Sequence, residues 1–201
     1  MDGSQESTSQ VAAATPAGEG NGWGPLSGLP GNPMMWILIA SELLVFGAAL
    51  IGFAGARALD PVGFAESQSL LNRPLGAINT AVLLTSGLFA ALAVQARREE
   101  KSSLSRIHLA IAALFGFGFM VVKFVEYGEK FAAGIDVDTN TFFTLYYLVT
   151  GFHLAHVVFG IIILALVGIW NSEENLETGT AFWHMVDLVW VLIFPVIYLM
   201  R

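Results

Sequence analysis

The chain has 201 residues, of which 55% are hydrophobic and 12% are charged, about half the charged share of an ordinary soluble domain. It contains no cysteine, which excludes disulfide bonds, thiolate metal sites and cysteine nucleophiles. The net charge is −7 with nine Lys and Arg residues, which argues against nucleic-acid binding because phosphate contacts need basic side chains.

Residues 1–32 form a polar segment rich in Ser, Gly, Ala and Pro. This segment has neither Lys or Arg nor a continuous apolar core, so it lacks the features of a secretory signal. Its composition predicts a disordered tail. Asn32-Pro33 then indicates the start of a helix, because a proline in the first helical turn costs little.

Five apolar stretches follow the tail, and each is long enough to cross a bilayer, which takes ~20 residues of helix. They cover residues 33–57, 75–95, 104–128, 140–169 and 178–200. The third and fourth are longer than a crossing needs, which indicates tilt or extension into water. The sequence therefore predicts an all-α, multi-pass membrane bundle of five helices as one domain, residues 33–201.

Basic residues in the connections bear on orientation through the positive-inside rule. The side that holds the tail carries Arg97, Arg98, Lys101 and Arg106, and the other side carries Arg57, Arg73, Lys123, Lys130 and Arg201. These numbers do not separate the two orientations. The densest basic group, RREEK at residues 97–101, favours an N-terminus in the cytoplasm.

Five ionisable residues fall inside the apolar stretches, where a charged side chain is costly and marks a candidate functional site. They are Glu42, His153, His156, His184 and Asp187. A helical rise of 1.5 Å per residue places them in one layer, ~9–20 Å from the face that holds the tail. We therefore expect a buried polar cluster in which Glu42 pairs with an imidazole, because pairing lowers the cost of burying either group.

Three interpretations of this cluster stay open. Three His and two carboxylates could bind a metal, but the His-x2-His spacing is weak evidence, and membrane di-iron enzymes need more than the four histidines present. Chains of Asp, Glu and His also build proton relays. The simplest interpretation is hydrogen bonding that fixes helix packing, with a lipid headgroup or water nearby. We assign no catalytic residue and no metal ligand.

Other polar and aromatic residues are assigned to packing or to contacts with a partner or lipid. The third stretch ends in charged residues spaced three and four apart, which predicts ion pairs at the membrane surface or a solvated helix end. Two tryptophans align with Asp187 along one helical stripe. The residues of this group are Asn79, Lys123, Glu126, Tyr127, Glu177, Trp183 and Trp190.

Several motifs in order resemble subunit III of the haem-copper oxidases, over residues from about 32 to the end. They are 36-WILIASELLVF-46, 79-NTAVLLTSG-87, Glu126-Tyr127, 150-TGFHLAHVVFG-160, and Glu177 followed by 183-WHMVDLVW-190 and Ile197-Tyr198. Within this family, the stretch 30-PGNPMMWILIASELLVFG-47, the ENLETG connection and the YLMR ending look most like the short, five-helix member associated with nitric oxide reductase.

The resemblance implies a non-catalytic membrane subunit with no cofactor of its own, packed against a catalytic subunit that carries the haem and metal. Such a subunit would support assembly, stability or proton supply, with Glu42 as a carbodiimide-reactive glutamate and the cluster around it as its polar surroundings or phospholipid contacts. The resemblance also implies a bacterial inner membrane, with the N-terminus cytoplasmic and the C-terminus periplasmic. Seven-helix members have two further helices, so their lipid-holding cleft is not carried over.

Other functions remain as alternatives. The chain could be subunit III of a cytochrome c or quinol oxidase rather than of a nitric oxide reductase. It could also be a stand-alone proton or ion transporter, although we expect few buried charges in the half of the membrane away from the cluster. A membrane metalloenzyme is a further alternative.

Overall fold

A computed structural model describes residues 33–200 of the chain. The predicted tail, residues 1–32, lies outside this range. The helices are α1 (Pro33–Leu59), α2 (Pro61–Ser69), α3 (Arg73–Arg98), α4 (Ser102–Ala132), α5 (Thr141–Ile169), α6 (Glu173–Phe194) and a π-helical turn, η2 (Pro195–Leu199). Five of these segments are long and apolar enough to span a membrane, which confirms the predicted all-α bundle of five spans.

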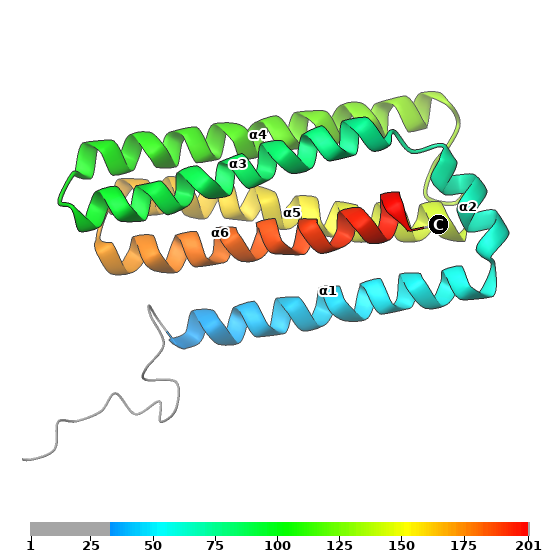
Figure 1. Cartoon of the computed structure of the whole chain (residues 1–201), viewed down its shortest axis with the longest axis horizontal. Coiled ribbons are helices and arrows are strands. Elements are labelled where there is room, and N and C mark those ends of the chain that lie inside the picture. The colour runs from blue at the N-terminus through cyan, green and yellow to red at the C-terminus, as the bar shows by residue number, and fades with distance from the viewer. Residues whose placement is uncertain (1–32, 201) are drawn as a thin grey trace, which may run out of the picture.

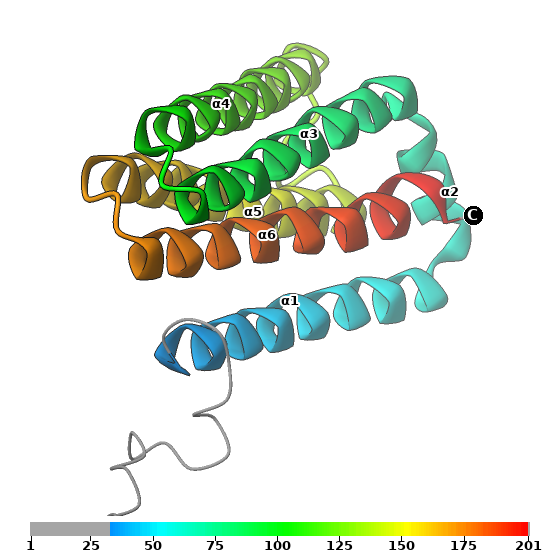
Figure 2. The same ribbon diagram turned by 60° about the vertical axis from the view of Figure 1, so that its left-hand side comes forward.

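The bundle consists of two layers of paired helices with one helix outside them. Helices α3 and α4 form one layer, α5 and α6 form the next, and α1 lies along the outside of the second layer (Figures 1 and 2). In an 18-residue apolar stretch of α1 only 11% of the residues are buried, against 56% in the corresponding stretch of the span that α6 begins. Most of the α1 surface therefore makes no contact with the rest of the described chain.

Capping side chains set the starts of four helices. The carboxylate of Asp60 accepts a hydrogen bond from Gly63 N at the start of α2, and Asn72 and Asn140 do the same for α3 and α5. Ser172 accepts from Asn175 N at the start of α6. Each cap satisfies a backbone N–H that has no partner within its own helix.

Helix α2 was not expected, because residues 58–74 read as a connection between two spans. Asp60 followed by Pro61 is a helix-start signal, and Phe64 inserts into the core, where its ring lies 5.4 Å from that of Phe53. The short helix crosses one end of the bundle (Figure 1). Its buried Gln68 donates a hydrogen bond to Ile197 O at 2.8 Å, so α2 also holds the last turn of the chain.

The fifth span changes its helical geometry near its end. Pro195 has no N–H to donate, which interrupts the α-helical ladder, and the chain continues as the π-helical turn η2. Met200 N donates to Pro195 O at 2.9 Å. The turn directs Tyr198 into the bundle, where it is fully buried.

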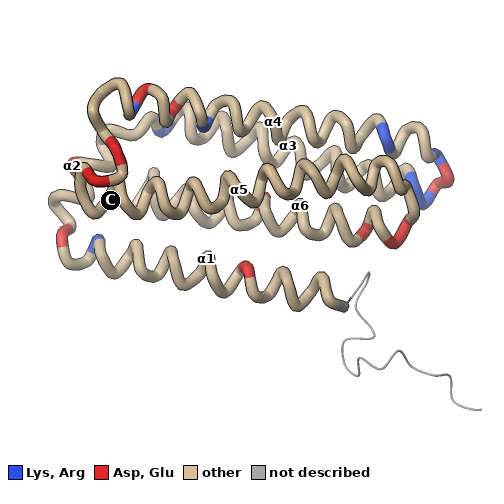
Figure 3. Tube along the Cα trace, turned by 180° about the vertical axis from the view of Figure 1, so that it is seen from behind, with Lys and Arg blue, Asp and Glu red and all other residues tan. Residues whose placement is uncertain are grey.

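Charged residues gather at the two ends of the bundle and are sparse along its middle (Figure 3). In the middle, the large buried side chain of Trp183 packs against two glycines. A Cβ added to Gly116 or Gly160 would lie 2.7 or 2.6 Å from the indole ring, closer than atoms can approach. These glycines therefore allow α4 and α5 to pack closely against α6, as small residues do in membrane bundles.

Candidate functional site

The contact between Glu42 and His156 joins α1 to α5. Glu42 Oε2 lies 3.1 Å from His156 Nε2, and the two side chains are 20% and 15% exposed. The ring of Phe46 lies 5.3 Å from the imidazole, and the ring of Phe152 lies 4.6 Å from it. The structure thus places Glu42 against one imidazole in mostly apolar surroundings.

A backbone carbonyl of α5 sets the orientation of the imidazole in this contact. His156 Nδ1 lies 2.9 Å from Phe152 O, and a carbonyl oxygen can only accept, so Nδ1 carries a hydrogen. A neutral ring would then present the lone pair of Nε2 to Glu42. Among residues 33–200, Glu42 Oε2 has no hydrogen-bond partner, so the 3.1 Å contact is a close approach of a carboxylate oxygen to an imidazole nitrogen.

His153 lies close to this pair but makes a separate contact set. Its side chain is fully buried, and its ring stacks on Trp190 with centroids 5.1 Å apart. The rings of Phe46 and Phe119 meet it edge-on. Among residues 33–200, neither imidazole nitrogen has a hydrogen-bond partner.

His184 and Asp187 lie on a different face of the bundle, against α3. His184 Nδ1 is 3.8 Å from Asp187 Oδ2, beyond hydrogen-bond distance. A Cβ at Gly87 would lie 2.2 Å from Asp187 Oδ2, so only a glycine leaves room for this carboxylate. Within the described part of the chain, no hydrogen bond or ion pair joins these residues to Glu42. The structure therefore divides the five residues of the predicted cluster into separate groups.

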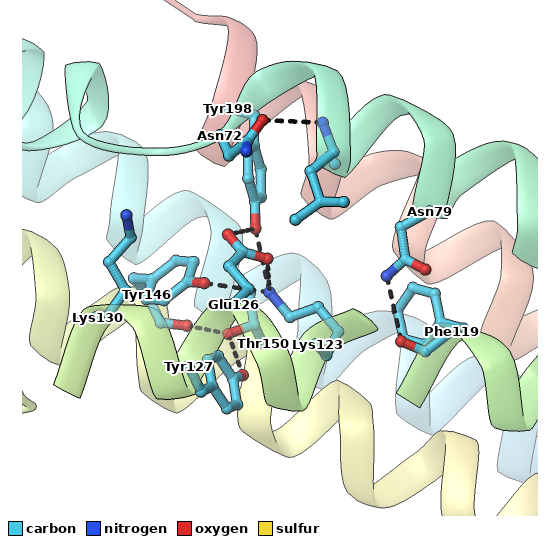
Figure 4. Close-up of polar contacts among 12 residues, drawn as sticks. Asn72, Asn79, Phe119, Lys123, Glu126, Tyr127, Lys130, Tyr146, Thr150 and Tyr198 are labelled. Atoms are coloured by element: carbon cyan, nitrogen blue, oxygen red, sulfur yellow. Dashed lines mark hydrogen bonds and ion pairs between the residues drawn. The ribbon is translucent and has the colours of Figure 1, made fainter. Parts of the chain in front are cut away.

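The second buried polar network surrounds Lys123 and Glu126, in the last third of α4, and Figure 4 shows its contacts. Lys123 Nζ lies 2.9 Å from Glu126 Oε2 and donates to the hydroxyls of Tyr146 and Tyr198, each at 3.1 Å. Tyr198 OH donates to Glu126 Oε1 at 2.7 Å. All three donors of the ammonium group thus have acceptors, contributed by α4, α5 and η2.

The location predicted for this ion pair was wrong. A surface pair or a solvated helix end was expected, yet the side chains of Lys123 and Glu126 are only 1% and 2% exposed. Four aromatic rings, those of Tyr127, Tyr146, Trp190 and Tyr198, lie 4.8–5.7 Å from the ammonium group. Among the described residues, this half of the bundle holds one buried ion pair of Lys and Glu, in keeping with the expectation of few buried charges there.

Trp190 contacts both buried groups. Lys123 Nζ lies 5.5 Å from the centre of the Trp190 ring, on which His153 stacks. The indole N–H of Trp190 donates to Thr80 Oγ1 at 2.9 Å. No hydrogen bond within the described residues connects His153 to Lys123, so the two groups do not form a continuous file of donors and acceptors.

The remaining predicted residues make contacts between helices. Trp183 Nε1 donates to Ser86 Oγ at 3.1 Å. Asn79 Nδ2 donates to Phe119 O at 3.3 Å, as Figure 4 shows. Three further contacts join Tyr127 OH to Thr150 Oγ1 at 2.7 Å, Arg98 Nη2 to Glu177 Oε1 at 2.7 Å, and Arg57 to the carbonyl of Met200.

Sequence reasoning missed the tyrosines of the Lys123 network. Tyr146 and Tyr198 lie in apolar stretches, where a phenol hydroxyl needs a partner, and this need was the available signal. Within residues 33–200, no group of three or more His, Asp and Glu side chains is arranged to hold a metal ion.

The fold and these contacts define a class: a five-span membrane bundle whose buried polar groups link its helices. A profile of the family described as "Cytochrome c oxidase subunit III" matches residues 27–201. The chain belongs to this family, whose members are non-catalytic subunits of oxidase complexes.

Three relatives illustrate the similarity. "Cytochrome c oxidase subunit 3" of Alkalihalophilus pseudofirmus is 32% identical over 176 residues, which cover 82% of this chain and 84% of that one. "Probable quinol oxidase subunit 3" of Staphylococcus saprophyticus is 24% identical, with 82% and 86% covered. "Heme-copper oxidase subunit I+III" of Aeropyrum pernix is 29% identical, with 82% of this chain and 22% of that longer protein covered.

Proposed function

We propose that the chain is subunit III of a haem-copper terminal oxidase of the cytochrome c or quinol type. In this role it packs in the membrane against a catalytic subunit that carries the haem and metal. The observation that carries the proposal is the Aeropyrum relative, in which the matching region belongs to a longer protein described as subunit I+III. Such a fusion supports direct contact between the two parts when they are separate chains.

The buried contacts support a role in assembly and stability. The Lys123 network ties α4, α5 and η2 together, and the Glu42 contact ties α1 to α5. Polar contacts between membrane helices contribute ~0.6–2 kcal/mol each and fix the geometry of packing. A bundle held in this way offers a defined surface to a partner subunit.

Proton supply is the second part of the proposed role. The Glu42–His156 contact brings a carboxyl group and an imidazole, two kinds of group that exchange protons, to within 3.1 Å of each other where α1 meets α5. Among the described residues, no hydrogen-bonded link between His153 and Lys123 offers a path for protons across the membrane, which favours a local role for the Glu42–His156 contact. A stand-alone transporter is therefore the weaker alternative.

The finer subtype stays a proposal with two candidates. The sequence motifs resemble the short member associated with nitric oxide reductase, whereas the three relatives described above are oxidase subunits. We favour the oxidase because those relatives match 82% of the chain, whereas the nitric oxide reductase assignment rests on short terminal and connecting motifs.

Orientation and location are proposed together. We place the chain in a bacterial inner membrane with its N-terminus in the cytoplasm and its C-terminus in the periplasm. The RREEK segment joins α3 to α4 at the end of the bundle where α1 begins (Figure 1), which supports this orientation under the positive-inside rule. Lys123 no longer counts for the opposite side, because it is buried within the bundle.

A bound phospholipid is also proposed. An apolar groove of about 340 Å³ lies between the first turns of α1, the end of α5 and the start of α6. Met35, Ile163 and Val167 are among its lining residues. Its position at one end of the spans suits an acyl chain whose headgroup stays at the membrane surface. Mass spectrometry of lipid retained after purification tests this binding.

The experiment that tests the main proposal is recovery of the full-length, affinity-tagged chain from native membranes in mild detergent. Recovery of a haem-copper oxidase catalytic subunit in about equal amount supports it. Recovery of a nitric oxide reductase catalytic subunit instead would assign the chain to the alternative subtype. A chain recovered alone, from membranes in which a haem-copper oxidase is active, would contradict both.

A further inference from the structure

A second polar seam runs along the contact between α3 and α6. It begins at the bundle end with the Arg98–Glu177 ion pair, whose atoms lie 2.7 Å apart. It continues inward to His184 and Asp187. Asp187 is the fifteenth residue of the 27-residue fifth span, so a rise of 1.5 Å per residue places it ~20 Å from the start of that span, near the middle of the membrane.

Asp187 is buried yet incompletely paired. Its side chain is 7% exposed, and its Oδ1 atom has no hydrogen-bond partner among residues 33–200. The other oxygen is 3.8 Å from His184 Nδ1, and the His184 side chain is 46% exposed. The hydrocarbon core offers no water to satisfy such groups. An unpaired acceptor beside a half-exposed imidazole at this depth therefore indicates that a donor from outside the chain completes the site.

The surroundings of Asp187 form a groove open to the lipid side. The groove has a volume of about 450 Å³, and its lining includes Gly87, Ala91 and Leu84 from α3 and Leu188 from α6, with Asp187 itself. The small, exposed Ala91 allows another helix to approach the backbone of α3 closely. Leucines on both sides provide apolar contact area around the single polar centre.

We propose that this groove, lined by Gly87, Ala91, His184 and Asp187, docks a transmembrane helix of the catalytic subunit. That helix presents a hydrogen-bond donor side chain to the Asp187 carboxylate, which lines the groove and is 7% exposed. The inference rests on the proposed function and adds the face through which the two subunits meet. A lipid headgroup does not suit the site, because headgroups lie ~15 Å from the mid-plane of a hydrocarbon core ~30 Å thick.

Photo-crosslinking in the intact complex tests which face is used. A photoreactive phenylalanine analogue replaces Leu188 in the groove of the full chain, and in a control chain it replaces Phe117 on α4. Both side chains are about half exposed, at 49% and 57%, and both lie about fifteen residues from the start of their span. We expect a crosslink to the haem-bearing subunit from position 188, at least tenfold stronger than from position 117.

The outcomes separate the two proposals. If the catalytic subunit copurifies but crosslinks from position 117, or from neither position, the groove is not the docking face. If position 188 crosslinks to a second copy of this chain, the proposed partner is wrong. If no catalytic subunit copurifies with the unmodified chain, the proposed function itself fails, and the docking face fails with it.

Substitution of Asp187 tests the acceptor. Asp187→Asn keeps an oxygen at the same position, whereas Asp187→Leu removes it at similar volume. With circular dichroism confirming that both variants fold, we expect Asp187→Leu to lower recovery of the catalytic subunit at least tenfold and Asp187→Asn to lower it less than threefold. Full recovery with a folded Asp187→Leu chain would overturn the acceptor role. If the Leu variant does not fold, the Asn variant alone decides: recovery of the catalytic subunit below one tenth of that with the unmodified chain would also count against the acceptor role of Asp187.

Discussion

The buried ion pair between Lys123 and Glu126 leads to a prediction whose size follows from its geometry. The ammonium group has three donors, which reach Glu126 at 2.9 Å and two tyrosine hydroxyls at 3.1 Å. Lys123→Met leaves Glu126, which is 2% exposed, without its cation. Breaking a buried pair by removing one partner costs ~3–5 kcal/mol. We therefore expect the equilibrium constant of unfolding to rise ~100- to 4,000-fold, at ~1.4 kcal/mol for each factor of ten.

A double-mutant cycle separates this pairing from simple loss of packing. Lys123→Met combined with Glu126→Gln removes both charges, and we expect it to be more stable than Lys123→Met alone. The free energy of unfolding is measured in mixed detergent micelles by circular dichroism. Lys130→Met is the control, because Lys130 is a partly exposed residue that donates to a backbone carbonyl. Losses that simply add in the double variant, or a loss below ~1 kcal/mol for Lys123→Met, would refute the reasoning.

Two further predictions concern packing and the contact between Glu42 and His156. Gly160→Ala places a methyl group 2.6 Å from a buried indole carbon and should lower the free energy of unfolding by ~1–3 kcal/mol. Gly151→Ala is the control in the same unfolding assay, because its methyl group meets no atom within 4 Å and should not lower this free energy. Equal effects of the two substitutions would argue against this packing. His156→Leu removes the imidazole nitrogen that contacts Glu42, so the carboxyl group becomes more accessible and its carbodiimide labelling should rise several-fold by mass spectrometry. His184→Leu should leave this labelling unchanged, and a reversed result would mean that Glu42 pairs elsewhere.

The five spans could be predicted because a membrane helix is defined by a local property, a run of about 20 apolar residues. The observed bounds differ from the expected ones by a few residues at most ends, as for α3 at 73–98 against 75–95. Helix α2 was missed because it is short and crosses the end of the bundle. Asp60-Pro61 is its start signal, but the same two residues are also typical of a turn, so they predict a helix only once the ends of the flanking spans are known.

The predicted cluster shows what position along a helix cannot reveal. Depth follows from the rise per residue, but the direction of a side chain around the helix axis matters only relative to neighbouring helices. Glu42 and His156 face each other, whereas Asp187 faces Gly87 on α3. The five residues therefore share a depth without sharing a site, and the arrangement of the helices was needed to separate them.

The buried position of Lys123 was hidden for a related reason. An oppositely charged pair three residues apart near a helix end looks the same in sequence whether it faces water or protein. Its burial depends on Tyr146 and Tyr198, which come from α5 and from the π-helical turn after Pro195. That turn is an irregular feature produced by packing as well as by proline, and no periodic pattern predicts the direction of Tyr198.

The central claim is that this chain works as an accessory subunit beside a haem-bearing partner. The most direct test is the haem content and native mass of the full-length, tagged chain purified gently from its own membranes. The account predicts one complex that contains this chain and a catalytic subunit in equal numbers, with the reduced-minus-oxidised absorbance spectrum of a haem protein. A preparation with the mass of this chain alone and no haem absorbance, from membranes that retain oxidase activity, would contradict it.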